Sequence, residues 1–408
     1  MCIRDSLRMA RRIDEAGLGF LLDFHYSDWW ADPGKQIKPA AWEGLEFDVL
    51  VDSVYRYSYD VIDALRAQGT VPSMVQIGNE IRTGMLWPDG RVDGEHDTPE
   101  QWDHLAALLD AGRRGVLDAA GDVPPRIMIH FDNGAKNEMG RYFYDNLVAR
   151  GLEFDAIGLS FYSKWHGSLD ELRANLPDLS ARYDKDIYVV ETAYPWTLDW
   201  HDEAPNIFGT EEDLHEGYPP TVDGQSAFLS EVRSAVEAVP GGRGRGIFYW
   251  APEWIPVEGI ECHWENAALF DFNGRALPGL DALAGRDAGD VPIVTIDGPA
   301  VIAFWRHPES DSVLDSDPAF ATALDDIQYY GVQSGERLAE LNITYLDQPG
   351  LRFRIRNDAG EKLFAAAPDS SDVGYLLVTP RLEYKTLYRV QYPDDLLREA
   401  AGFLDDGR

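Results

Sequence analysis

Short apolar segments alternate with longer amphipathic stretches through the first 283 residues, and this alternation restricts the fold more than any other feature. The segments typical of strands cover residues 20–25, 74–78, 126–131, 156–161, 187–190 and 246–250. The stretches typical of helices cover residues 47–68, 102–120, 138–150, 169–183 and 224–239. Near-continuous apolar strands that alternate with helices are typical of a parallel sheet covered by helices. The sequence therefore predicts an α/β protein.

Polar and aromatic residues directly follow the predicted strands. His25-Tyr26, Asn79-Glu80 and Glu191-Thr192 are examples. In a TIM (β/α)8 barrel, the loops at the carboxyl ends of the strands carry the active site. A doubly wound sheet usually has a glycine-rich phosphate-binding turn instead, and the sequence contains neither GxGxxG nor GxxxxGK[ST]. The barrel is therefore the favoured fold.

The alternation ends near residue 283, where the composition changes. Residues 284–292 are rich in Gly, Asp and Pro, which is typical of a linker. In the remainder, strands are expected at residues 301–305, 351–356, 375–378 and 385–390, and helices at 317–341 and 393–404. We therefore predict a barrel at 1–283, a linker at 284–292, and a small α+β domain of unassigned role at 293–408.

The charge of the chain excludes several classes of partner. It has 36 basic and 71 acidic residues, a formal net charge of −35. Such a chain repels nucleic acid and anionic membrane surfaces. The 12 Trp, 19 Tyr and 17 Phe side chains offer faces on which sugar rings can stack. The two cysteines make neither a disulfide framework nor a zinc cluster. We expect a neutral partner, and neither nucleic acid nor a membrane.

Two glutamates, Glu80 and Glu191, each follow a predicted buried strand. Burial disfavours the charged carboxylate, and the same effect keeps a general acid protonated near neutral pH. Glu80 alone is better explained by an ion pair with a basic neighbour. Two such residues across one barrel mouth could instead form the carboxyl pair that glycoside hydrolysis needs. The pair is therefore more informative than either member.

Several motifs occur in a recognisable order. They are LDFHYSD at 22–28, WADPGKQ at 30–36, VQIGNE at 75–80, IGLSFYSKWHG at 157–167, VETAY at 190–194 and YWAPEW at 249–254. This string resembles the arabinogalactan endo-β-1,4-galactanases of glycoside hydrolase family 53, over residues 7–283. The resemblance implies a retaining enzyme that cleaves the β-1,4-galactan side chains of pectic arabinogalactan. It implies Glu80 as acid/base after strand four and Glu191 as nucleophile after strand seven, with carboxyl groups about 5–5.5 Å apart.

The resemblance also implies that the six predicted strands are strands three to eight. Residues 7–17 resemble the end of a helix, so the chain is expected to begin inside the barrel, without its first two strands. A truncated gene model or an incomplete assembly explains this better than a natural six-stranded barrel. Residues 20–25 and 246–250 would then be unpaired edges, and this chain could be inactive. We expect an extracellular or periplasmic protein whose export signal is lost with the missing region.

Further roles are implied by the resemblance. The expected substrate-binding residues are His25, Asp28, Asn79, Trp87, His130, Tyr162, Trp165, His166 and Trp250. Trp250 would be the platform under the sugar at the scissile bond, with core filling as the alternative, and Tyr162 would bond the nucleophile. Asp28 is equally suited to capping a turn.

No cofactor is expected, and the protein is expected to be a monomer that binds galactan. Some bacterial relatives carry a structural calcium, for which Asp199, His201, Asn206 and Asp271 are the candidates, although their spacing is not that of an EF-hand. The alternatives are another glycanase of the same clan, such as a mannanase, xylanase or cellulase, and an inactive carbohydrate-binding fragment.

Overall fold

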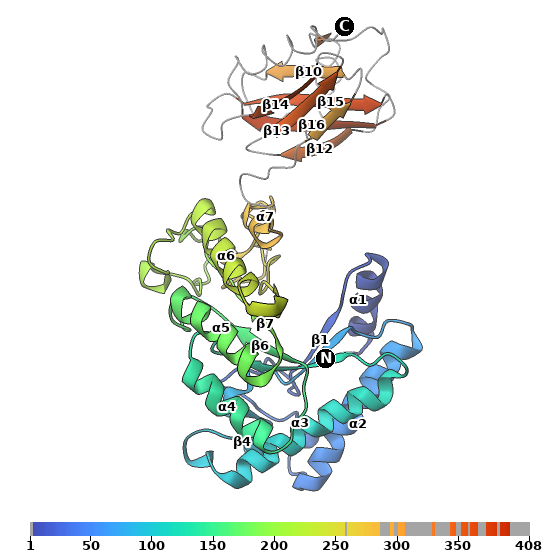
Figure 1. Ribbon diagram of the computed structural model, residues 1–408, viewed down its shortest axis with the longest axis vertical. Helices are drawn as coiled ribbons and strands as arrows, with labels where there is room; N and C mark the ends of the chain where they lie inside the picture. The colour runs from blue at the N-terminus through green and yellow to red at the C-terminus, as the bar shows by residue number, and fades with distance from the viewer. Residues whose placement is uncertain are drawn as a thin grey trace. The chain divides into compact units, whose positions relative to one another are not determined.

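The computed structural model divides into two compact units, Met1–Gly285 and Arg286–Arg408 (Figure 1). In the first unit the structure describes residues 3–257 and 259–285. In the second it describes the backbone of eight strands between residues 294 and 391. The first unit carries the predicted barrel.

A six-stranded parallel sheet is the centre of the first unit, and its strands are arranged in chain order. They are β1 (Leu21–Phe24), β2 (Met74–Ile77), β5 (Arg126–Phe131), β6 (Ala156–Ser160), β7 (Asp186–Glu191) and β8 (Gly244–Ile247). Parallel strands in chain order, each followed by a helix, are the arrangement of a (β/α)8 barrel. The curled sheet forms an open barrel of six strands, which confirms the predicted fold class. Within the described residues, β1 and β8 are its two edges, as expected.

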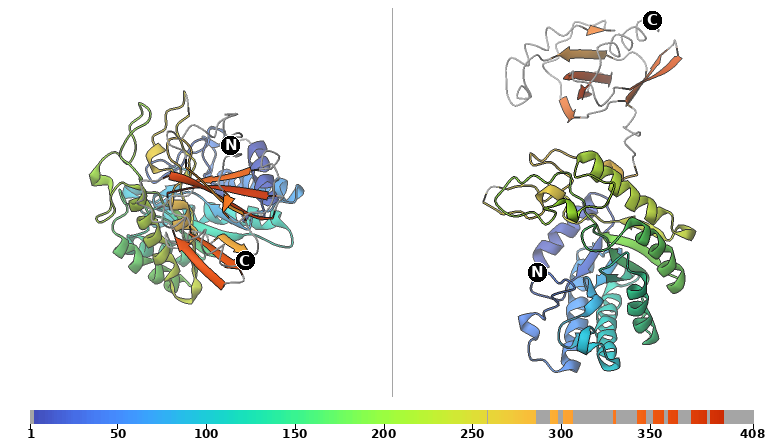
Figure 2. Two further views of the ribbon diagram at one scale, coloured as in Figure 1. Left: turned by 90° about the horizontal axis from the view of Figure 1, so that it is seen from above. Right: turned by 90° about the vertical axis from the view of Figure 1, so that its left-hand side faces the viewer.

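Helices pack side by side along the outer face of this sheet (Figure 2). They are α1 (Ile3–Glu15), α2 (Phe47–Ala67), α3 (Pro99–Ala120), α4 (Asn137–Ala149), α5 (Leu169–Tyr183), α6 (Val222–Glu237) and α7 (Gly279–Leu283). Two helix starts are encoded locally. The Thr98 side chain accepts a hydrogen bond from the Gln101 backbone before α3, and Ser168 with Glu171 forms a capping box before α5. The helices from α2 to α6 begin and end within three residues of the predicted bounds.

Short elements lie in the loops of this unit. They are the 3₁₀ turns η1 (Ala40–Trp42), η2 (Ile81–Thr83), η3 (Gly94–His96), η4 (Glu211–Asp213), η5 (Pro240–Gly242) and η6 (Glu265–Ala267), and the hairpin strands β3 (Gly84–Met85) and β4 (Gly90–Arg91). The η2 turn, the hairpin and η3 all lie between β2 and α3.

The strands alternate between two apolar environments. Ile127 and Ile129 of β5 belong to the main core, which the sheet shares with the helices. Met128, between them, packs with Met74 and Ala156 in a separate small cluster. Because successive side chains of a strand point to opposite faces, this second cluster marks the barrel interior. Polar side chains of the same parity, further along the strands, therefore also point inward.

The second unit contains two sheets within its described residues. One has the order β11-β10-β15-β16-β12 and the other β14-β13-β9. The strands are β9 (Val294–Asp297), β10 (Val301–Arg306), β11 (Tyr329–Tyr330), β12 (Ile343–Asp347), β13 (Arg352–Asn357), β14 (Gly360–Ala365), β15 (Val373–Arg381) and β16 (Tyr384–Gln391). The four predicted strands appear as β10, β13, β15 and β16. Sequence analysis missed β9, β12 and β14.

One predicted helix of the second unit is wrong in its middle. The range 317–341 contains β11, which pairs antiparallel with residues 302 and 303 of β10. Two consecutive tyrosines favour a strand that can pair with a neighbour over a helix. The rest of that range lies outside the described residues. So do the predicted helix at 393–404 and the linker from residue 286 onward.

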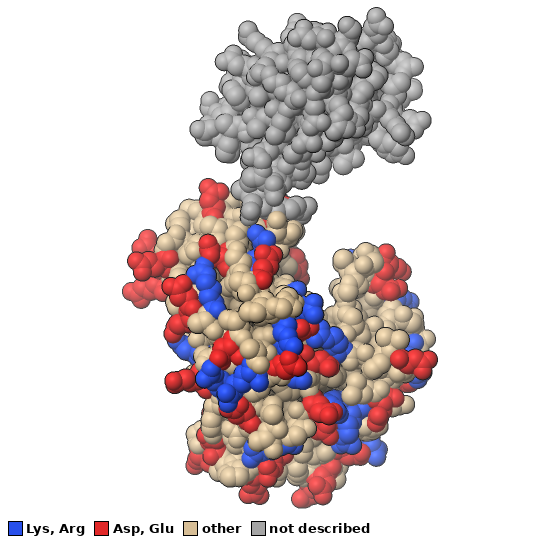
Figure 3. Space-filling view, viewed as in Figure 1, with Lys and Arg blue, Asp and Glu red and all other residues tan. Residues whose placement is uncertain are grey.

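Charged side chains cover the first unit without forming a patch of one sign on the face drawn in Figure 3. Several ion pairs join neighbouring helices: Arg150 with Asp103 between α4 and α3, at 2.6 Å, and Arg141 with Asp178 between α4 and α5. Exposed pairs of this kind contribute at most about 1 kcal/mol each. Among the described helices, none is both long and apolar enough to cross a membrane.

Candidate active site

A cavity of about 550 Å³ opens at the carboxyl ends of the six strands, and we call it the cleft. The loops after β1, β2, β5, β6 and β8 contribute to its walls, together with Glu191, the last residue of β7. The lining residues are His25, Trp30, Ala31, Asp32, Pro33, Asn79, Glu80, Arg82, Asp132, Asn133, Tyr162, Trp165, His166, Glu191, Trp250 and Trp264. Acidic groups and aromatic rings therefore share one concave surface, at the end of the barrel where such folds bind substrates.

Glu191 reaches the cleft because β7 is irregular at its end. Residues 156–159 of β6 pair one-to-one with residues 186–189 of β7, but Ser160 pairs with Glu191, so Val190 is an extra residue. Val190 itself belongs to the cluster inside the barrel. In a regular strand the next side chain would point outward, toward the helices. The bulge directs Glu191 inward instead, a common use of bulges beside functional sites.

Glu80 is presented by a turn rather than by a strand. The β2 strand ends at Ile77, and Glu80 has a left-handed backbone with φ +50° and ψ +49°. This conformation costs a residue with a Cβ roughly 1–2 kcal/mol. Gly78, two residues earlier, has φ +81°, and a Cβ there would lie 2.7 Å from Ile81. The chain thus tolerates a strained turn that places the Glu80 carboxylate over the cleft.

The two carboxylates lie close to each other. An oxygen of Glu80 and an oxygen of Glu191 are within 4.8 Å. Burial raises the pKa of Glu80 well above its usual range, and the charge of Glu191 raises it further. Burial also raises the pKa of Glu191, while a hydrogen bond from Tyr162 opposes this. Two carboxyls so close and so poorly solvated resist being ionised together, so the pair readily holds one proton.

Tyr162 secures Glu191. Its hydroxyl donates a hydrogen bond to Oε2 of Glu191 at 2.8 Å, and both side chains are buried. Burial, together with the charge of Glu191, raises the pKa of Tyr162 well above its usual range. The phenol therefore stays protonated and remains a donor. A permanent donor favours the ionised form of Glu191.

Ser160 and His130 support Glu80. The Ser160 hydroxyl lies 2.6 Å from Oε1 of Glu80, and Nε2 of His130 lies 2.9 Å from that hydroxyl. Nδ1 of His130 lies 3.0 Å from Oδ1 of Asn79. Burial lowers the pKa of His130 to about 3, so the ring is neutral. Both ring nitrogens contact protein groups, so His130 serves as a support beneath the cleft.

Aromatic rings form the far wall of the cleft. Trp250 lies edge-on to Trp30, with ring centroids 6.4 Å apart. Trp30 also stacks on Trp254 at 5.6 Å, and Trp264 donates its indole N–H to the Trp250 carbonyl. These contacts fix the ring planes before any ligand arrives, which is the condition for an effective stacking surface.

The structure brings most of the expected substrate-binding residues into the cleft. His25, Asn79, Tyr162, Trp165, His166 and Trp250 line it. Asp28, Trp87 and His130 are not among the lining residues. Asp28 accepts a hydrogen bond at 2.8 Å from the backbone N–H of Ala40, the first residue of η1. Trp87 donates to the Thr83 carbonyl and packs under the Arg91 guanidinium, 4.3 Å from the ring centroid.

Several residues of the site were not among the predicted site residues, and four of them differ in the sequence signal that could have found them. Trp30 lies inside the WADPGKQ motif, so the motif itself could have indicated it. Asp132 and Ser160 occupy strand ends, which is a weaker signal. Arg82 donates from Nε to both oxygens of Asp132 at 3.0 Å, a pairing between two loops that no local pattern predicts.

The four predicted calcium ligands do not form one cluster in the described part of the chain. The Oδ1 atom of Asp271 already accepts two backbone N–H groups of its own turn, both at 2.9 Å. Oδ1 of Asn206 is buried without a hydrogen-bond partner. Asp199, His201 and Asp271 do not bring their ligand atoms together within 4.8 Å. The described acidic, His and Cys side chains that do so are Glu80, His130 and Glu191.

The sequence of this chain is similar to those of known proteins. The chain is 49% identical over 284 residues to an uncharacterised protein of Niallia circulans, covering 68% of this chain and 77% of that protein. It is 35% identical over 281 residues to the arabinogalactan endo-beta-1,4-galactanase of Thermothelomyces thermophilus, covering 67% of this chain and 80% of the relative.

The fold of this chain is also similar to that of a solved structure. The GH53 catalytic domain of Ignisphaera aggregans matches with a TM-score of 0.65 and 40% identity, over 70% of this chain and 78% of that one. The family model described as glycosyl hydrolase family 53 matches residues 3–283. The resemblance found in the motifs is thereby confirmed, and this chain belongs to glycosyl hydrolase family 53.

Proposed function

We propose that this protein is a retaining endo-β-1,4-galactanase that acts as a monomer on the galactan side chains of pectic arabinogalactan. The observation that carries the proposal is the pair Glu80 and Glu191, with carboxylate oxygens within 4.8 Å, in a cleft walled by tryptophans. Retaining enzymes hold their carboxyl groups about 5–5.5 Å apart, whereas inverting enzymes need about 6.5–9.5 Å to admit a water molecule. Several relatives named as galactanases support the choice of substrate.

The two glutamates would act in sequence. Glu191, whose ionised form is favoured by the hydrogen bond from Tyr162, attacks the anomeric carbon while Glu80 gives its proton to the departing glycosidic oxygen. A covalent bond now joins Glu191 to the sugar whose anomeric carbon reacted, so the part of the galactan chain that carries this sugar stays on the enzyme. Glu80, now ionised, takes a proton from water, which attacks the same carbon and releases Glu191. Two inversions give net retention of configuration.

The proposed substrate also suggests where the protein acts. Pectic galactan is a cell-wall polymer too large to enter a cell by diffusion, so we propose that the protein works in the extracellular or periplasmic space. Its net charge of −35 fits a neutral polymer.

The proposal is tested with a panel of polysaccharides. Reducing-sugar release from galactan should exceed release from mannan, xylan and cellulose, and equal release from all four would contradict the proposed specificity. Proton NMR of the first products should show the β-anomer before mutarotation. An initial α-anomer would exclude the retaining mechanism.

A further inference from the structure

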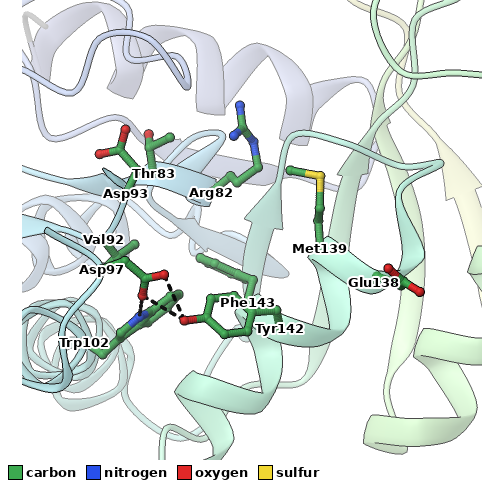
Figure 4. Close-up of a pocket in the computed structure, with 10 residues that line it drawn as sticks. All are labelled: Arg82, Thr83, Val92, Asp93, Asp97, Trp102, Glu138, Met139, Tyr142 and Phe143. Atoms are coloured by element: carbon green, nitrogen blue, oxygen red, sulfur yellow. Dashed lines mark hydrogen bonds between the residues drawn. The ribbon is translucent and has the colours of Figure 1, made fainter. Parts of the chain in front are cut away.

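A second cavity of about 350 Å³ lies next to the cleft, between the loop after β2 and the start of α4 (Figure 4). Arg82 lines both cavities. Its Nε donates to both carboxylate oxygens of Asp132, which lines the cleft. The Arg82 side chain is therefore the shared wall between the cleft and the second cavity.

An exposed aromatic ring is held in a fixed position in this second cavity. Tyr142 is 52% exposed, yet its hydroxyl donates to the Asp97 carboxylate at 2.8 Å. Trp102 is buried below and donates its indole N–H to the same carboxylate, also at 2.8 Å (Figure 4). The two rings meet edge to face, with centroids 5.8 Å apart. An exposed ring that is fixed in advance loses little entropy when a flat ligand stacks on it.

The charges around this cavity favour a neutral ligand. Arg82 supplies one positive charge, and Asp93, Asp97 and Glu138 supply three negative ones. Asp93 is paired with Arg91, and Asp97 accepts from the two aromatic residues. A polymer of uronic acids would be repelled here, whereas hydroxyl groups could donate to the carboxylates. Sugar rings combine such hydroxyls with C–H faces suited to Tyr142 and to Met139, which is 42% exposed.

The position of the cavity indicates which part of a polymer it would meet. It is formed by the segments that follow Glu80 and β5, whereas Glu191 lies at the end of β7, two strands beyond β5 in the sheet. In the proposed mechanism, Glu191 holds the sugar whose anomeric carbon reacts, and Glu80 serves the oxygen that leaves. A galactan chain running past Glu80 and Arg82 would thus enter the cavity with its departing portion.

We propose that this second cavity binds sugar units of the leaving-group portion of the galactan chain, with Tyr142 as its stacking surface. The inference rests on the proposed function and extends it, because it makes the enzyme prefer long chains over short ones. The expected effect of losing this stacking surface is a change in binding of about tenfold at most.

The test compares a substrate that reaches the cavity with one that does not. Tyr142→Ala should raise KM for long galactan about fivefold to tenfold. It should change kcat/KM for an aryl β-galactobioside, which has no sugar in its leaving group, less than twofold. Tyr142→Phe, which keeps the ring, should stay within threefold of the wild type on both substrates. Val148→Ala, at an exposed position of α4 outside the cavity, is the matched control and should match the wild type.

Other results of this test would contradict either the inference alone or the proposed function as well. An unchanged KM for long galactan in Tyr142→Ala, or an equal loss on both substrates, would overturn the inference and leave the proposed function intact. Met139→Ala provides a second variant in the cavity if Tyr142→Ala melts at a lower temperature. A wild-type chain that neither cleaves galactan nor is retarded by it in native gels would overturn the proposed function as well.

Discussion

The two sides of the cleft hold their carboxylates in opposite ways. Glu191 completes a strand, is directed inward by a bulge, and accepts a hydrogen bond from a buried phenol. Glu80 stands on a left-handed turn outside the sheet and contacts the hydroxyl of Ser160. The Tyr162 phenol stays protonated and donates its proton to the Glu191 carboxylate, whereas the Ser160 hydroxyl lies between Glu80 and the His130 ring and can donate to either of them. The Glu191 side therefore favours one protonation state, and the Glu80 side accommodates two.

His130 explains how the Glu80 side can serve both states. When Glu80 is ionised, Ser160 donates to it, and the neutral His130 ring can donate to Ser160 from Nε2. When Glu80 carries a proton on Oε1, it can donate to Ser160, which then donates to an unprotonated Nε2. The histidine changes tautomer rather than charge, because burial keeps its pKa at about 3. An acid that must later act as a base needs this adaptability.

The largest loss of activity is expected at Glu191, the carboxylate whose contacts favour one protonation state. Glu191→Ala removes the nucleophile and should lower kcat/KM for galactan by roughly 10⁴-fold or more. Azide should restore cleavage of an activated galactoside and give the α-galactosyl azide, identified by NMR. Full activity without azide would assign the nucleophile to another residue.

The next effect should depend on the leaving group. Glu80→Ala removes the general acid, so kcat/KM for natural galactan should fall about 10²- to 10⁴-fold. A dinitrophenyl galactoside needs no proton to depart, so its glycosylation step, followed in a pre-steady-state burst, should stay nearly unchanged. An equal loss with both substrates would show that Glu80 acts on binding or folding instead.

Removing the phenol hydroxyl should have a smaller effect. A hydrogen bond to a charged group is worth about 1.5–3 kcal/mol, so Tyr162→Phe should lower kcat/KM about 10- to 100-fold. That bond also lowers the pKa of Glu191, and its loss should raise that pKa. Because the nucleophile must be ionised, the acidic limb of the pH profile should move to higher pH. An unmoved acidic limb would contradict the assigned contact.

The barrel and the two glutamates were predictable because they depend on local signals. Each strand is a compact apolar run, and Glu80 and Glu191 follow two of them directly. The cooperation of His130 with Ser160 was not predictable, since it depends on two strands that pair 30 residues apart in the chain. In the sequence, His130 lies at a strand end like the residues that line the cleft. On β5 it is two residues from Met128, which faces the barrel interior, so the His130 side chain also points into that interior. Trp250 was assigned to a strand end, whereas β8 ends at Ile247 and the tryptophan follows in a loop.

The smallest effect on activity is expected at Ser160, which contacts Glu80. It should appear on the alkaline limb of the pH profile, whereas Tyr162→Phe acts on the acidic limb. The Ser160 hydrogen bond lowers the pKa of Glu80 against the effect of burial. Ser160→Ala should therefore raise that pKa further. Glu80 must be protonated to assist departure, so the alkaline limb of kcat/KM should move to higher pH while the acidic limb stays in place. Near neutral pH, the rate should change only about threefold.

The two variants together separate the sides of the cleft. Tyr162→Phe should move the acidic limb and Ser160→Ala the alkaline limb, because each hydroxyl contacts a different carboxylate. If Ser160→Ala moved the acidic limb instead, Ser160 would be acting on the nucleophile. If both variants moved both limbs by similar amounts, the carboxyls would titrate as one unit. The contrast between a fixed and an adaptable carboxylate would then be wrong.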